Sequence, residues 1–343
     1  RLAEAWLALA ELEMRKPRPD VEEARKALRE VGEGSQASSE ARQRRDYVEI
    51  WLATVDGDLG KAVALGEVFL TAWPESVLVP EVQLKVAELY YRQADFANAR
   101  TGFEKVVREH ADSSFADTAL YYAGMSAAAV MTEEGVDQAI GLWEELADRG
   151  GDLGHAARRQ QALAKRRQGR EGEALAVLDK LMEEPDVDVG LRRLLTCEMA
   201  EILIVLAKSG VTVPVEASEI LREMLKDEDL PCLWRLRAGF TLAASQKEMG
   251  NKALALEACY DAVKSTESDP PSTPDEYDWY FKAGFFAVEL LEEEAQWEAA
   301  ARMAEVLAES GGARAEEAGK RAAKIRLAHF LWDGESEAPV EEP

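Results

Sequence analysis

The sequence predicts an all-α solenoid of about eight stacked helix pairs and a closing helix. The first observation is an alanine that recurs eight times, at intervals of 35 to 45 residues. The eight are Ala24, Ala62, Ala99, Ala139, Ala174, Ala217, Ala255 and Ala300. The second observation concerns the residues that follow each alanine. The residue four positions later is mostly bulky or apolar, and the residue seven positions later is apolar. The alanine and these two residues share one helix face. Self-similarity at this period is typical of stacked helical repeats.

A third observation places the first helix of each pair. In five copies a small or apolar residue stands twelve positions before the alanine, the distance from mid-helix through a tight turn to an antiparallel partner. These residues are Ile50, Ala87, Ala162, Ala243 and Val288. Seven positions after each, a residue that is small or can take up left-handed backbone is placed to end the first helix. These turn residues are Gly57, Ala94, Gly169, Gly250 and Ala295.

Taken in order, the pairs are expected at 1–34, 35–78, 79–112, 113–150, 151–186, 187–229, 230–270 and 271–312. The first, fourth and sixth copies have a longer spacing, and we expect extra residues at 16–20, 132–135 and 208–215 to lengthen the turn inside the pair. Residues 313–332 follow as an amphipathic closing helix, with Leu327 to Phe330 among its apolar residues. Residues 333–343 are acidic and contain proline, so a disordered tail is expected there.

The third copy resembles the tetratricopeptide repeat (TPR) most closely. Its first helix contains residues 86–90 (VAELY), the turn is Ala94-Asp95-Phe96, and Ala99 and Phe103 follow in register; Ala111 stands where the family usually has proline. The resemblance covers about residues 1–312. It implies a right-handed superhelical solenoid whose first helices line a concave, protein-binding surface.

In such repeats, the positions three before and one after the small residue of the first helix point inward. These positions, with one neighbour, hold Trp6, Tyr47, Trp51, Leu84, Glu88, Tyr91, Tyr121, Met125, Phe240 and Phe285. The rings could anchor an extended or helical peptide, since aromatic anchors dominate many interfaces. Equally, they could only pack between adjacent first helices. Both interpretations stay open at this stage.

The charge balance disfavours polyanionic partners. Sixty-six acidic against 41 basic residues give a formal net charge of −25, which would repel nucleic acid and anionic lipid surfaces. The strongest basic run is Arg158, Arg159, Lys165, Arg166, Arg167 and Arg170. We interpret it as charge balance against nearby glutamates, with an anionic client as the alternative. No long apolar run occurs, so membrane insertion is not expected.

No residue pattern indicates an enzyme, a cofactor or a metal site. The three cysteines, Cys197, Cys232 and Cys259, have no CxxC spacing and are expected to be buried free thiols. His110, His155 and His329 lie outside metal and triad motifs, so surface or capping roles are expected.

The segment from His110 to Tyr122 is similar to the junctions of bacterial envelope repeat proteins, such as the Tol-Pal-associated coordinator and the barrel-assembly lipoprotein. The resemblance implies a periplasmic or envelope-associated scaffold, with a cytoplasmic location as the alternative. The expected function is therefore non-enzymatic binding of a protein or peptide. The alternative is an accessory domain of a larger enzyme or membrane protein, because Arg1 begins within a helical stretch and we expect the natural chain to extend further.

Overall fold

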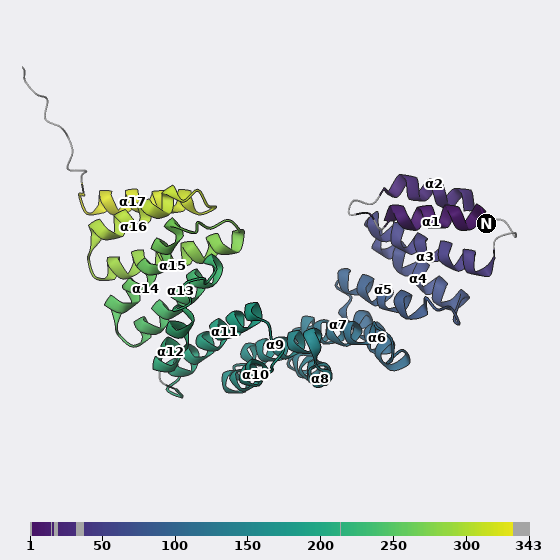
Figure 1. Ribbon diagram of the computed structural model, residues 1–343, viewed down its shortest axis with the longest axis horizontal. Coiled ribbons are helices and arrows are strands. Elements are labelled where there is room, and N and C mark those ends of the chain that lie inside the picture. Colours follow the sequence, from purple (N-terminus) through teal and green to yellow (C-terminus); the bar gives the residue numbers. More distant parts are fainter. Residues whose placement is uncertain (1, 15, 17–19, 32–37, 213, 332–343) are drawn as a thin grey trace, which may run out of the picture. The chain divides into compact units, whose positions relative to one another are not determined.

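The computed structural model describes residues 2–14, 16, 20–31, 38–212 and 214–331 (Figure 1). All regular structure in this part of the chain is helical, which confirms the predicted all-α fold of helix pairs. The chain forms two compact units, Arg1–Gly169 and Arg170–Pro343. The division separates the two helices expected at 151–186.

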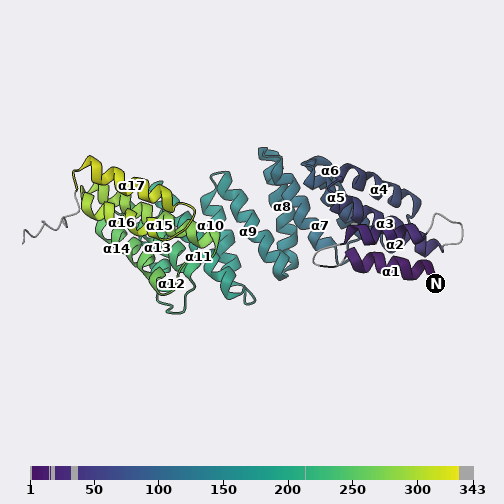
Figure 2. The same cartoon turned by 90° about the horizontal axis from the view of Figure 1, so that it is seen from above.

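The described residues of the first unit form nine helices. They are α1 (Leu2–Met14), α2 (Val21–Val31), α3 (Ser39–Val55), α4 (Leu59–Ala72), α5 (Val79–Arg92), α6 (Phe96–Glu109), α7 (Ala116–Ala129), α8 (Glu133–Arg149) and α9 (Gly151–Arg167). Consecutive helices pack against each other, and Figure 2 shows α7, α8 and α9 side by side.

In the part of the second unit that the structure describes, there are eight α-helices and one short 3-10 helix, η1 (Ser265–Glu267). The α-helices are α10 (Glu171–Glu183), α11 (Val189–Lys208), α12 (Pro214–Met224), α13 (Cys232–Glu248), α14 (Lys252–Lys264), α15 (Pro274–Glu293), α16 (Trp297–Glu309) and α17 (Ala315–Ala328). Here α13 also packs on α15, and α16 packs on α17 (Figure 1). None of the helices in the described residues combines the length and apolar content needed to cross a bilayer.

The repeated alanines are all fully buried. All eight are 0% exposed, and the five small or apolar residues of the first helices are at most 1% exposed. Each copy therefore buries a stripe that begins at a residue without a long side chain, which lets a neighbouring helix approach. The predicted helix register is confirmed by this burial.

The five predicted turn residues all have left-handed backbone. Their φ angles run from +55° at Ala295 to +80° at Gly57. An aspartate follows two of these turns and caps the next helix: the Asp58 side chain accepts from the amide of Lys61, and Asp95 accepts from Asn98. Only three residues therefore connect the two helices, because the turn reverses the chain and the cap satisfies the new amides.

Gly66 stands four positions after Ala62, where most copies have a bulky residue. The packing around it explains why a glycine is present. A Cβ built on Gly66 would lie 2.4 Å from Cγ2 of Val86. The bulk that other copies supply from the second helix is supplied here by the following first helix.

Two expectations differ from the structure. Residues 133–135 extend the start of α8, which has 17 residues, and the turn before α8 stays three residues long; Thr132 caps this longer helix through the amide of Gly135. The closing helix buries Ala318, Ala322 and Ile325, but Leu327 and Phe330 are 76% and 77% exposed. The expected tail, 333–343, lies outside the described residues.

Candidate binding site on the first helices

The inward residues predicted from the sequence all lie on first helices and are half-buried. Trp6 is on α1, Tyr47 and Trp51 on α3, Leu84, Glu88 and Tyr91 on α5, Tyr121 and Met125 on α7, Phe240 on α13, and Phe285 on α15. The last two belong to the second unit and the others to the first. Their environments differ: some line a cavity and others pack against neighbouring rings.

Tyr47 and Trp51 line a cavity of about 470 Å³ in the first unit. Their rings meet edge to face, with centroids 6.2 Å apart. We call this space the Tyr47–Trp51 cavity. Its walls come from α1, α3, the α4–α5 connection and α5: Glu11, Met14, Glu40, Gln43, Arg44, Tyr47, Val48, Trp51, Val77, Leu78 and Glu81. Its volume falls in the range of pockets that hold small ligands or a few side chains.

The polar wall of this cavity is organised by contacts between successive repeats. Arg44 donates two hydrogen bonds to the Glu11 carboxylate, at 2.8 and 2.7 Å, and these bonds raise the pKa of Arg44. The Tyr47 hydroxyl donates to Glu81. Each pair joins positions 33 or 34 residues apart, about one repeat.

Trp51 contributes an aromatic ring to the same cavity. The Lys85 ammonium lies 4.7 Å from its ring centroid and pairs with Glu88 at 3.0 Å. The indole Nε1 is buried and has no hydrogen-bond partner among the described residues. Val77, on the α4–α5 connection, is 92% exposed at the edge of the same cavity.

The remaining predicted aromatic residues of the first unit pack against other rings and helices. Tyr91 contacts Phe96 and Tyr122 edge to face, at 5.4 and 6.1 Å, and burial raises its pKa. The Tyr121 hydroxyl accepts from Gln160 at 3.3 Å. Trp6, Tyr121 and Met125 pack on the hydrophobic core. These residues therefore pack between helices in the structure.

The two predicted rings of the second unit belong to a larger aromatic group. Phe240 contacts Trp279 and Phe286, at 5.7 and 5.5 Å between centroids. Phe285 stacks on Phe281 at 6.0 Å, and the Arg314 guanidinium lies 4.5 Å from its centroid.

Sequence reasoning missed Trp279. The centroid of its ring lies 4.0 Å from the Lys282 ammonium and 5.2 Å from the Arg237 guanidinium. It also missed Glu81 and the Glu11–Arg44 pair. The one-repeat spacing of the latter contacts is a signal that could have identified them, because residues in equivalent places of adjacent repeats lie near each other.

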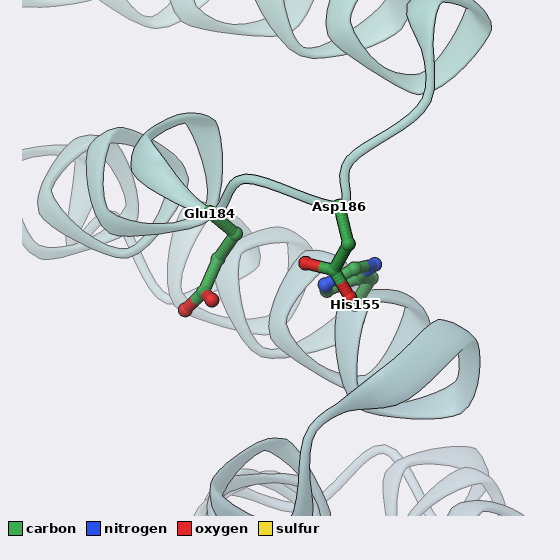
Figure 3. A group of neighbouring side chains, drawn as sticks. All are labelled: His155, Glu184 and Asp186. Atoms are coloured by element: carbon green, nitrogen blue, oxygen red, sulfur yellow. The ribbon is translucent and has the colours of Figure 1, made fainter.

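The histidines and cysteines lie within helices or at helix ends. His110 and His329 stand at helix C-termini as expected, and the His329 ring stacks on Trp297 at 3.7 Å. His155 lies on α9 (Figure 3). It is 6% exposed, so the expected surface role is wrong. Glu184, drawn in the same figure, is the residue directly after α10, and Asp186 stands two residues further along the chain. Burial raises the pKa of Cys197 and of Cys259 to about 12, which keeps both thiols protonated.

The basic run on α9 and the following turn is engaged in the structure. Arg158, Arg159, Lys165 and Arg166 all interact with other groups. Arg170 donates to Glu173 at 2.8 Å. The Arg170–Glu173 pair is of the kind that charge balance against nearby glutamates predicts.

Residues 81–113, which span most of α5 and all of α6, match the family model of the tetratricopeptide repeat. The α5–α6 pair of this chain is a tetratricopeptide repeat. The match lies on the copy whose residues resembled the family most closely. The match concerns the α5–α6 pair and does not test the resemblance to envelope proteins.

Solved structures with the same fold resemble this repeat protein over most of its length. The C-terminal part of a TPR repeat-containing protein from Cytophaga hutchinsonii has a TM-score of 0.53 at 13% identity, covering 79% of this chain and 98% of that one. A tetratricopeptide repeat protein from Parabacteroides merdae has a TM-score of 0.48 at 14% identity, covering 83% and 98%. At such identities the likeness concerns the fold. No curated protein matches the sequence.

Proposed function

We propose that this repeat protein is a non-enzymatic scaffold that binds a segment of a partner protein on the first helices of its first unit. The observation that carries the proposal is the Tyr47–Trp51 cavity, with its volume of about 470 Å³. Repeat arrays bind partners across the surface that successive repeats share. Tyr and Trp are the side chains most often found to dominate such interfaces.

Three features support α3 as the centre of the binding surface. Tyr47 and Trp51 are half-buried, so their rings are held by the fold but keep accessible area. The Glu11–Arg44 hydrogen bonds join α1 to α3, and the Tyr47–Glu81 hydrogen bond joins α3 to α5. A preformed site of this kind loses little side-chain entropy when a partner binds.

The non-enzymatic part of the proposal rests on the state of the nucleophilic side chains. A thiol acts as a nucleophile only as the thiolate. Cys197 and Cys259 are 0% exposed and have pKa values raised to about 12. They therefore serve as core residues of the second unit.

We further propose a bacterial cell-envelope location, in the periplasm, with the cytoplasm as the alternative. The support is the likeness of the segment from His110 to Tyr122 to envelope repeat proteins. Fractionation of the source cells, followed by detection of the native protein, tests this location. Recovery only in the cytoplasmic fraction would contradict it.

Partner capture tests the binding function. The full chain is immobilised, exposed to a lysate of the source organism, and compared with a Tyr47→Ala/Trp51→Ala variant. We expect the retained partner to be lost, since one aromatic anchor contributes about 2 kcal/mol or more, roughly 30-fold in affinity. Circular dichroism checks that the variant keeps its helix content.

The matched control removes two exposed rings from the second unit. In a Tyr260→Ala/Phe330→Ala variant, capture should equal that of the wild type, since Tyr260 and Phe330 are 38% and 77% exposed and lie outside the cavity. Equal capture by the wild type and by the Tyr47→Ala/Trp51→Ala variant would exclude this cavity as the binding surface.

A further inference from the structure

We infer that the Tyr47–Trp51 cavity selects a partner segment carrying a lysine or arginine next to an apolar side chain. The inference rests on the proposed function and adds the chemistry of the ligand. It follows from three properties of the cavity: its uncompensated negative charge, the position of a carboxylate beside a tyrosine, and an exposed apolar residue in its wall.

The first property is the charge of the wall. Three carboxylates and one guanidinium line the cavity, from Glu11, Glu40, Glu81 and Arg44. Both hydrogen bonds between Arg44 and Glu11 run between charged groups in a bidentate pair, which commits the guanidinium to that carboxylate. Two carboxylates, those of Glu40 and Glu81, are left without a cation of the wall to balance them.

The second property is that Glu81 is held in place but keeps room for a ligand. Its carboxylate accepts the Tyr47 hydroxyl and has no further hydrogen bond or ion pair within the described residues. An ionised carboxylate has about four acceptor sites, so one hydroxyl leaves most of them open. The ring of Tyr47 lies beside it, and an aromatic face attracts an ammonium or guanidinium group.

Glu40 supplies the second carboxylate. It lies in the first turn of α3 and is exposed. It forms no hydrogen bond or ion pair in the part of the chain that the structure describes, although its charge helps to raise the pKa of Arg44. A partner cation placed between α3 and α5 would therefore meet two carboxylates whose charge no lysine or arginine of the wall neutralises.

The third property is the apolar part of the wall, formed by Met14, Val48, Trp51, Val77 and Leu78. Val77 is 92% exposed, so covering it with a partner's apolar side chain removes apolar surface from water. Lys85 already lies against the Trp51 ring and pairs with Glu88. We therefore place the partner's apolar side chain near Val77 and Leu78 and its cation near Tyr47, Glu40 and Glu81.

The charge of the whole chain favours the same ligand. With a net charge of −25, it repels an acidic segment at long range and attracts a basic one. An acidic client, such as a phosphorylated peptide, would meet this repulsion as well as the two unbalanced carboxylates.

Peptide selection on the intact protein tests the inference. A displayed library of random nonapeptides is selected on the immobilised full chain, with the Tyr47→Ala/Trp51→Ala variant used to subtract peptides that bind elsewhere. We expect the enriched peptides to share a lysine or arginine beside an apolar residue. The most enriched sequence is then synthesised, with a partner peptide in which norleucine replaces each basic residue.

Binding of the synthetic peptide is measured by fluorescence anisotropy. A Glu40→Gln/Glu81→Gln variant should bind it about 5- to 10-fold more weakly at low salt, a size expected for two exposed charge pairs. The loss should shrink at about 300 mM NaCl because salt screens exposed charges. A Glu30→Gln/Glu133→Gln variant changes net charge equally at two exposed positions outside the cavity and should bind like the wild type.

The outcomes separate the inference from the proposed function. Peptides that depend on Tyr47 and Trp51 but lack a basic residue, or that bind the Glu40→Gln/Glu81→Gln variant normally, overturn the charge inference and leave the binding function standing. A selection that yields no peptide dependent on Tyr47 and Trp51 overturns both.

Discussion

At the scale of single residues, the fold depends on small side chains at fixed positions. Ala99 is 0% exposed and belongs to a core with Ala87, Phe103, Val106 and Ala123, contributed by α5, α6 and α7. Protein interiors are close-packed, so a site that accommodates one methyl group has no space for a larger side chain.

We expect Ala99→Leu to lower the free energy of unfolding by about 1–3 kcal/mol, because the added atoms must separate helices already in contact. The urea midpoint measures the effect. Ala97→Leu is the matched control, because Ala97 lies on the same helix and is exposed. A midpoint for Ala99→Leu equal to that of Ala97→Leu would show that the α6 register is wrong.

At the scale of elements, the turn inside each pair is a left-handed residue between two helices. Glycine occupies this place at Gly57, Gly169 and Gly250, with φ of +70° to +80°. In two pairs alanine is held in the same region, at φ +59° for Ala94 and +55° for Ala295. A Cβ makes this conformation unfavourable by about 1–2 kcal/mol, so the surrounding helices impose it.

Ala94→Gly should therefore stabilise the protein, by up to about 1 kcal/mol after the larger chain entropy of glycine in the unfolded state is subtracted. Ala97→Gly, three residues further along in a helix, should destabilise it by about 0.5–1 kcal/mol. Thermal unfolding followed by circular dichroism compares the two. The same sign for both variants would contradict the role assigned to the left-handed turn.

At the scale of the whole molecule, negative charge is in large excess. The ion pairs between helices, such as that of Arg149 on α8 with Asp117 on α7 at 2.8 Å, are at least partly exposed. Pairs of this kind contribute about 0–1 kcal/mol each. The net charge of −25 remains, and self-repulsion of that charge opposes compact structure.

Stability should consequently rise as salt increases from about 10 mM to about 300 mM at neutral pH, because the Debye length falls from about 30 Å to below 10 Å. Urea midpoints in NaCl and KCl series measure the change, and agreement between the salts assigns it to ionic strength. A midpoint that falls with salt would mean that local ion pairs outweigh the net repulsion.

The sequence by itself determined the helix pairs and their register. Apolar spacing of four and seven residues, small residues at the crossings and left-handed turn residues are local properties, so they can be read without knowing what lies opposite. The spacing rules failed at one connection. Residues 133–135 could extend either a turn or a helix, and the Thr132 cap places them in α8.

Only the tertiary structure decided which inward aromatic residues border open space. Tyr47, Trp51, Tyr91 and Tyr121 follow the same pattern in the sequence, yet the first two line a cavity and the others pack against neighbouring rings or helices. The difference depends on how successive repeats are offset and on which side chains meet across them. Glu81 gains its place beside Tyr47 in this way, from 34 residues away, because contacts between repeats are set by packing and carry no local pattern.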